Sequence, residues 1–174
     1  MPTNLLSRRT LLAAGCGTAL MAAAGAGVSG LLLPARAQGL APTPTMRGGA
    51  NNYRPGAPIV ERIGGGGFWT SGTVRRAGDG ARLAGVRIQM WAHTTEGHER
   101  DERSHGATLT DANGFFRLEM PQIVPAFGQP HGHLAYDNEF AGEHDGRYET
   151  VFLRPIMPSS SDTSLETHFV LQPI

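Results

Sequence analysis

The sequence predicts an all-β fold, an antiparallel β-sandwich with an extended N-terminal arm. From residue 68 onward, short runs of β-branched and aromatic residues alternate with turn residues, which is typical of a sandwich of antiparallel strands. No stretch after residue 37 shows a helical repeat of apolar residues. Once a targeting segment is set aside, the chain of 174 residues has the length of one domain.

Seven strands are expected, each bounded by residues that favour turns. They cover residues 68–75, 86–93, 106–110, 115–120, 131–136, 148–154 and 167–171. Turns are expected at residues 78–80 and 111–114, because the glycines and the asparagine there tolerate a positive φ. Along the second strand, apolar residues alternate with polar or aromatic ones. We therefore expect one of its faces to lie in the core, namely Val86, Ile88, Met90 and Ala92.

The segment before the strands is interpreted as an arm and linker. Residues 38–67 are rich in Gly, Pro, Asn and Thr, show little apolar periodicity and end in four consecutive glycines. The predicted organisation is therefore a signal peptide over 1–37, an arm over 38–67 and a β-sandwich over 68–174.

The first 37 residues have the features of a twin-arginine export signal. Arg8 and Arg9 directly precede a run of Ala, Gly, Leu and Val that reaches Leu33 without a charge. Residues 35–37, Ala-Arg-Ala, place small side chains at the positions that a signal peptidase recognises. We expect export by the twin-arginine machinery, cleavage before Gln38 and a mature protein in the bacterial periplasm.

Two other interpretations of this segment stay open. The run from Leu11 to Leu33 is just long enough to span a membrane as an anchor. A lipoprotein box that ends in Cys16 would instead tether the mature protein to lipid. The many glycines and alanines, together with the cleavage site, favour removal of the segment.

The composition limits which side chains could hold a metal and which partners the protein could bind. Cys16 is the only cysteine, so the mature domain has no disulfide and no thiolate ligand, and a metal must be held by His, carboxylate or Tyr. The twin-arginine route carries folded proteins, which often receive a metal before export. Three of the 15 basic residues and no acidic residue precede Gln38, which leaves 12 basic and 15 acidic residues and a formal charge of −3. This balance argues against nucleic acid as a partner.

The histidines are the sharpest sign of a functional site. Six of the seven lie between residues 93 and 144. His131 and His133 flank Gly132, and residues two apart on a strand share one face with Cα atoms roughly 6.5 Å apart. Both imidazoles can therefore converge on one metal ion at about 2.1 Å. The alternative is a pair of solvated histidines at a strand edge.

A third ligand is expected from the residues that follow the Trp91 strand. His93, His98 and Glu99 would reach the histidine pair if that strand neighbours residues 131–136. His98 and Glu99 also belong to a charged run, so a solvated loop is the alternative.

The other histidines and the tyrosines are weaker candidates. His105 and His144 are expected at the surface, and His168 is expected to be structural. Tyr136 lies an odd number of residues from the histidine pair, so on a regular strand it faces away and packs. Tyr148 stays open, because its position depends on the strand topology.

Four segments follow one another in a recognisable order: residues 72–74 (GTV), 83–91, which end in Trp91, 110–117 (TDANGFFR) and 130–133 (PHGH). This succession resembles the intradiol ring-cleavage dioxygenases, the catechol and protocatechuate class, over about residues 70–135. Transthyretin-like and other prealbumin-type sandwiches share the Trp strand and the hairpin motif. The His-x-His motif at the right distance makes the resemblance to the dioxygenases more specific.

The resemblance implies a non-haem ferric iron held by two histidines and two tyrosinates, with His131 and His133 as the histidines. Phenolate stabilises Fe(III), which activates a bound catecholate toward oxygen. Here His98 and Glu99 stand where the family has its first tyrosine, and residues 124–127 stand where it has the second. With both phenolates missing, His98 or Glu99 is expected to complete a site that takes Fe(II), Cu or Zn more readily than Fe(III).

The predicted function is that of an exported metal protein of the intradiol dioxygenase type. Its activity would be the O2-dependent cleavage of a catechol-like ring between the two hydroxyl-bearing carbons, with Trp91 and Phe127 lining an apolar pocket for the ring. A homodimer is compatible with this interpretation. The alternative is a catalytically inactive periplasmic β-sandwich that serves as a binding or structural module.

Overall fold

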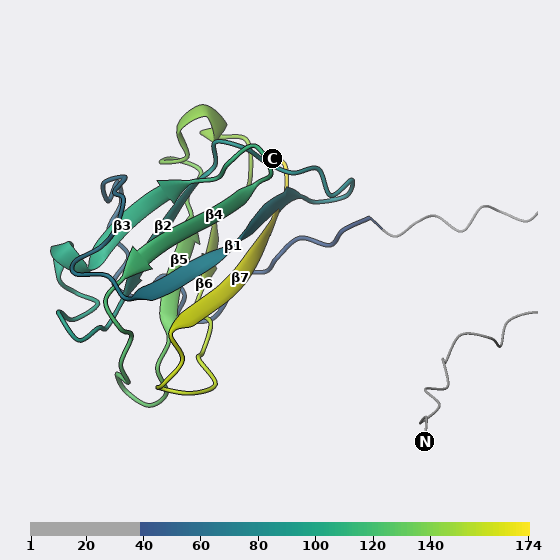
Figure 1. The fold of residues 1–174 in the computed structure, drawn as a ribbon. Coiled ribbons are helices and arrows are strands. Elements are labelled where there is room, and N and C mark those ends of the chain that lie inside the picture. The colour runs from purple at the N-terminus through teal and green to yellow at the C-terminus, as the bar shows by residue number, and fades with distance from the viewer. Residues whose placement is uncertain (1–38) are drawn as a thin grey trace, which may run out of the picture. The chain divides into compact units, whose positions relative to one another are not determined.

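Two β-sheets face each other in the computed structural model, which describes residues 39–174 (Figure 1). One sheet has three strands in the order β4-β1-β7, and the other has four strands in the order β3-β2-β5-β6. The strands are β1 (Phe68–Arg76), β2 (Arg87–Ala92), β3 (His105–Leu109), β4 (Phe115–Met120), β5 (Gly132–Tyr136), β6 (Val151–Leu153) and β7 (Ser164–Leu171). Two 3-10 helices lie in the connections, η1 (Glu102–Ser104) and η2 (Gly142–His144).

The predicted all-β sandwich is confirmed, and each expected strand overlaps an observed one. Strand β4 has the predicted bounds. Strand β6 is shorter than expected, because Tyr148 forms an isolated bridge with Pro173 outside the ladder. Strand β7 begins earlier than expected, since Ser164 already pairs with Trp69 of β1. The β1–β7 pairing is parallel, whereas the other strand pairs are antiparallel.

The turn between β3 and β4, which lie in different sheets, forms where the sequence predicts it. Gly114 has a φ of 69°, and a Cβ at this position would lie 2.6 Å from the carbonyl oxygen of Val74, so only glycine fits. The Asp111 carboxylate accepts hydrogen bonds from the backbone N–H groups of Asn113 and Phe115 at 2.8 and 2.9 Å. An Asx turn of this kind favours the reversal of the chain.

The core lies between the two sheets. The predicted core face of β2 is confirmed, because its alternate apolar side chains and Val86 just before it all belong to the main buried cluster. Large side chains from both sheets complete this cluster, among them Phe68, Phe116, Leu134, Tyr136 and Phe169. Burying each of them stabilises the fold by roughly 1.5–3 kcal/mol.

The arm is bonded to both sheets. Its backbone pairs with Gly78 through Leu40, with Val170 through Thr43 and with Phe152 through Met46. Near its end, Ile63 is only 4% exposed and joins the core cluster. Residues 40–63 therefore pack along the sandwich.

The arm also covers the outer face of β2. Every residue of this strand is buried, including those that point away from the core. The Gln89 amide donates to the carbonyl of Arg54 at 2.8 Å, and the Trp91 indole donates to the carbonyl of Asn51 at 2.9 Å. Arg87 donates in the same way to the carbonyl of Ala57. The outer face of β2 is thus closed off from water.

The expected signal peptide, the cleavage site before Gln38 and Cys16 lie outside the described residues. Within residues 39–174, no helix has the length and apolar character needed to cross a membrane.

Candidate metal centre

Strand β5 directs two imidazoles toward the covered outer face. His133 pairs with Trp91 across the β2–β5 ladder, and His131 precedes the strand in a bridge with Ile156. The two residues share a face because they are two apart in extended chain. Their rings lie 5.1 Å apart at 72°, and their exposed fractions are 4% for His131 and 1% for His133.

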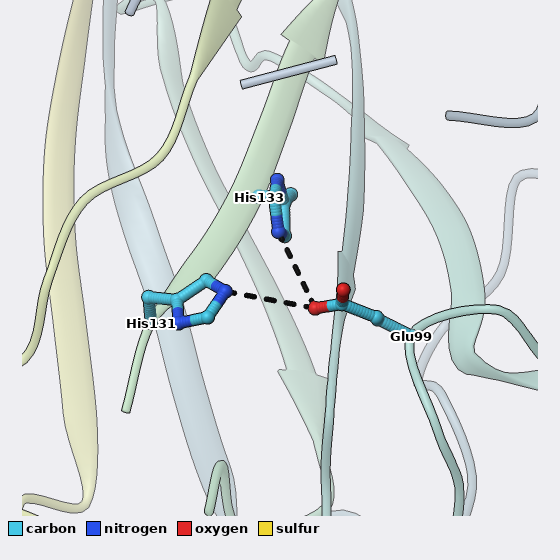
Figure 2. Close-up of side chains that lie close together, drawn as sticks. All are labelled: Glu99, His131 and His133. Carbon is cyan, nitrogen blue, oxygen red and sulfur yellow. Dashed lines mark ion pairs between the residues drawn. The ribbon is translucent and has the colours of Figure 1, made fainter. Parts of the chain in front are cut away.

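Glu99 completes the cluster from the loop between β2 and β3. Its Oε2 atom lies 3.6 Å from Nε2 of His131 and 3.4 Å from Nε2 of His133, as Figure 2 shows. The three ligand atoms lie within 4.8 Å of one another, and all three residues are buried. His105 helps to hold this loop in place, since its Nε2 lies 2.9 Å from the backbone carbonyl of Glu99.

Hydrogen bonds to Nδ1 determine the tautomer of both histidines. Nδ1 of His133 lies 3.0 Å from the carbonyl of Gly49, and Nδ1 of His131 lies 2.9 Å from the carbonyl of Gln129. A carbonyl only accepts, so both Nδ1 atoms carry the hydrogen. Arg154 also approaches Nδ1 of His131, at 3.4 Å, but a guanidinium can only donate. The contact with Gln129 is shorter, so we assign the hydrogen on Nδ1 of His131 from that contact. In the neutral form of each imidazole, Nε2 therefore presents its lone pair to Glu99.

This arrangement fits a metal ion. Among residues 39–174, the Oε2 atom of Glu99 and the Nε2 atom of His133 are buried without a hydrogen-bond partner. Burial lowers the pKa of His133, which favours the neutral imidazole that binds metals. A buried polar atom without a partner costs about 1–3 kcal/mol, and a cation among the three atoms would satisfy them all.

The spacing and the outer contacts agree with such an ion. Two ligand atoms, each about 2.1 Å from a tetrahedral zinc, are about 3.4 Å apart, close to the separations between Glu99 and the two histidines. In metal sites, a histidine typically donates its other N–H to a carbonyl or carboxylate. Both histidines here do so.

The structure brings Glu99, His131 and His133 together but leaves His98 apart. The His98 ring packs against His93 at 4.9 Å, and its Nδ1 accepts from the backbone N–H of Arg100 at 3.1 Å. Of these two consecutive loop residues, Glu99 and not His98 points at the histidine pair.

Trp91 and Phe127 do not form a common pocket wall. Trp91 is fully buried, with His133 stacked at 5.1 Å and His105 at 5.5 Å. Phe127 is 83% exposed and has a φ of 53°. Trp91 therefore supports the cluster by packing, while most of the Phe127 side chain contacts solvent.

The prediction that His105 lies at the surface is wrong, since it is only 4% exposed. Its ring stacks on Trp91, and its Nε2 bonds to the backbone of Glu99. The sequence gives no sign of this, because the stacking partner lies on the neighbouring strand.

None of the three tyrosines in the sequence directs its hydroxyl at the cluster. Tyr53 donates to Asp137, and Tyr136 packs in the core, as predicted, and donates to the carbonyl of His144 at 3.0 Å. Tyr148 packs against the ring of Tyr136. Burial raises the pKa of Tyr136 to about 12, so it is a neutral phenol. The absence of phenolate ligands, expected from the sequence, holds within the described residues.

Two residues of the arm that contact the cluster were not predicted from the sequence. Asn52 donates its side-chain amide to Oε1 of Glu99 at 2.7 Å, and Gly49 accepts from His133. These partners are 47 and 84 residues apart in the chain. The only local signal is a polar Asn-Asn pair that follows Gly48-Gly49-Ala50 in a segment with little apolar periodicity.

A surface hollow of about 310 Å³ lies beside this part of the arm. It is lined by Asn52, Tyr53, Arg54 and Arg100. Arg54 donates to the backbone carbonyl of Arg100 at 2.6 Å, which joins the arm to the loop that contains Glu99. Asn52 therefore both lines this hollow and bonds to the buried carboxylate of Glu99.

No family model and no curated protein matches the sequence. Solved structures do match the fold. Hydroxyquinol 1,2-dioxygenase from Pseudomonas putida DLL-E4 aligns with a TM-score of 0.54 at 12% identity, over 78% of this chain and 68% of that one. The dioxygenase domain of a dioxygenase carbohydrate-binding protein fusion from Streptomyces sp. SirexAA-E aligns with a TM-score of 0.52 at 18% identity, over 76% of this chain and 97% of that one.

A third similar structure is 3-chlorocatechol 1,2-dioxygenase from Rhodococcus opacus 1CP, with a TM-score of 0.50 at 18% identity over 70% of this chain and 69% of that one. At these identities the likeness concerns the fold. The resemblance predicted from the motifs is confirmed at this level: the chain has an intradiol dioxygenase-like β-sandwich.

Proposed function

We propose that this chain, which has the fold of the intradiol dioxygenases, is a non-haem metal protein with Glu99, His131 and His133 as its protein ligands. One observation carries the proposal: three buried donor atoms from distant parts of the chain converge, and two of them have no hydrogen-bond partner within residues 39–174. A purely structural cluster would be expected to satisfy these atoms internally.

The donor set favours a divalent ion. Two neutral imidazoles and one carboxylate with open positions are typical of non-haem Fe(II) sites, and the same ligands suit zinc. Phenolate, which stabilises Fe(III), is missing from the cluster. We therefore propose Fe(II) as the working metal, with Zn and Cu as competitors in the same site.

The proposed activity is O2-dependent cleavage of a catechol-like ring between its two hydroxyl-bearing carbons. One ring and one O2 give a ring-opened dicarboxylic acid, so the reaction needs no further reductant. The bound metal would supply the Lewis-acid and redox centre. The chain's own residues orient the ligands: the carbonyls of Gly49 and Gln129 hold the imidazoles, and the packed Trp91 excludes water from one side.

A second candidate is a metal-binding or structural module without catalysis. It is favoured by the burial of the cluster, since Glu99, His131 and His133 are at most 5% exposed. A ring could reach the metal only if the covering arm or loop moved.

We also propose that the protein acts in the periplasm after twin-arginine export. Arg8, Arg9 and the uncharged run behind them support this, and so does a site suited to metal insertion before export. Cell fractionation of a variant with Arg8→Lys and Arg9→Lys tests it. Retention of the variant in the cytoplasm is expected, whereas unchanged export would exclude this route. The mass of the exported protein distinguishes cleavage before Gln38 from lipid attachment at Cys16.

The function is tested on protein purified from cells that express the full chain. Metal content by mass spectrometry should approach one ion per chain and should be lost when His131 and His133 are both changed to Ala. Oxygen uptake with catechol, hydroxyquinol and chlorocatechol, after anaerobic loading with Fe(II), then separates the two candidates. Uptake supports the dioxygenase, and bound metal without uptake supports the module. Metal content unchanged in the double variant would refute the ligand assignment.

A further inference from the structure

We infer that Asn52 is a positioning residue for the metal ligand Glu99, and that the arm segment 49–53, here called the strap, is an outer part of the metal centre. This rests on the proposed metal site. The side-chain amide of Asn52 donates a hydrogen bond to Oε1 of the Glu99 carboxylate at 2.7 Å, and Oε2 is directed at His131 and His133.

The bond controls how the carboxylate can bind. The terminal torsion of a glutamate is broad and nearly two-fold, so an unrestrained carboxylate rotates easily and presents either or both oxygens. The amide of Asn52 donates to one oxygen and thereby makes Glu99 a ligand through the other. Glu99 is only 5% exposed, so water does not readily replace this donor.

The backbone of Asn52 is suited to this position. Its φ is 58°, in the left-handed region that asparagine adopts more readily than most residues other than glycine. A glycine would keep the backbone and remove the amide. An aspartate would keep the shape and the tolerance of this φ but could not donate a hydrogen bond to Glu99 when ionised.

The rest of the strap holds other parts of the same site. The carbonyl of Gly49 accepts from Nδ1 of His133, and the carbonyl of Asn51 accepts from the indole of Trp91. Tyr53 packs on the Trp91 ring at 5.5 Å. Gly49 sits so close to the backbone of Phe152 that a Cβ would lie 2.7 Å away. The strap is therefore held in place on both sides of Asn52 in the chain, by Gly49 and Asn51 before it and by Tyr53 after it.

The test compares Co(II) and Zn binding by the full-chain protein with Asn52→Gly and with Asn113→Gly as a matched control. Asn113 is exposed in the turn between β3 and β4, and its side chain bonds to Arg82 and not to the cluster. We expect Asn52→Gly to weaken the binding of both metals by about 10- to 100-fold, the usual effect of removing a residue that bonds to a metal ligand. The control should stay within about twofold. The melting temperature of the metal-free proteins is measured in parallel.

The visible spectrum of bound Co(II) reports the coordination directly. In Asn52→Gly the d–d bands should change, because Glu99 is no longer held through one oxygen. A merely structural role would lower the melting temperature of the metal-free protein and leave this spectrum unchanged. Asn52→Asp, which has the same shape, should also alter the spectrum, and it decides the question if the glycine variant does not fold.

The outcomes separate this inference from the proposed function. If the wild type binds metal and either folded Asn52 variant keeps both the affinity and the Co(II) spectrum, the inference is overturned while the metal centre stands. If the wild type binds neither metal, the metal centre is refuted and the inference with it. Weaker binding with an altered spectrum in the variants alone supports both.

Discussion

Trp91 and His133 lie opposite each other on β2 and β5 and stack at 5.1 Å with their planes 11° apart. The stack fixes the plane of the imidazole, and the bond from His133 to Gly49 fixes its rotation. A single aromatic side chain thus links the packing of the sheet to the direction of a metal ligand.

Changing Trp91 should therefore affect both stability and metal binding. Trp91→Ala removes a fully buried ring and is expected to destabilise the protein by about 3–5 kcal/mol. Trp91→Phe keeps an aromatic face but loses the indole bond to Asn51, and a smaller cost of about 1–3 kcal/mol is expected. Urea unfolding of the metal-free proteins measures the difference. Equal costs would show that the stacking on His133 contributes little.

Single ligand variants should distinguish Glu99 from His98. His131→Ala, His133→Ala and Glu99→Ala should each weaken Zn binding by more than the roughly 10- to 100-fold expected for an outer-shell residue. His98→Ala should change it by less than about twofold, because that ring packs on His93 instead. Competition with a chelator of known affinity gives the values. A large loss in His98→Ala would place His98 among the ligands.

Glu99→Gln should stabilise the metal-free protein while it impairs metal binding. The new amide can donate to a Nε2 lone pair and still accept from Asn52 through its oxygen, so the buried carboxylate oxygen without a partner is removed. A gain of about 1 kcal/mol is expected for one added hydrogen bond. Urea unfolding without metal, together with Zn binding, checks the prediction. A loss of stability in this variant would mean that the carboxylate is already satisfied without a metal.

Metal should protect the wild type from unfolding. A ligand that binds only the folded state adds about 2.7 kcal/mol at a concentration 100 times its dissociation constant. Thermal melts with added Zn, and after chelation, measure this. The variant with both His131→Ala and His133→Ala serves as the control and should show no shift. A shift of equal size in that variant would place the metal elsewhere.

The arm should contribute to stability through Ile63. This residue is 4% exposed and packs in the core, so Ile63→Ala should cost about 2–5 kcal/mol. Ile59 offers a matched control in the same segment, because it is 57% exposed and its change to Ala should cost less than about 0.5 kcal/mol. Urea unfolding compares the two. Similar small effects would mean that the arm detaches easily from the sandwich.

The strands and two of the three residues of the cluster could be predicted from local patterns. Alternation of apolar residues identified β2 and its core face, and the same period of two placed His131 and His133 on one side of a strand. In a loop no such period exists, so the sequence alone does not decide between His98 and Glu99, and the structure is needed to show where each side chain points.

The arm's contribution could not be predicted, for a physical reason. Its bonds to His133 and Trp91 use backbone carbonyls, which every residue possesses and which leave no mark in the sequence. The error at His105 has a related cause: its burial depends on a stacking partner across the ladder, which only the strand order reveals.

The carbonyls of Asn51, Arg54 and Ala57 receive the three side chains that β2 directs outward. Main-chain acceptors make no demand on side-chain identity, but they depend on the number of residues between them. These three bonds should therefore survive exchanges at the three positions over evolutionary time, whereas one residue inserted or deleted between them would shift the acceptors out of register. For this set of contacts, selection would act on the spacing of the three positions more than on their side chains.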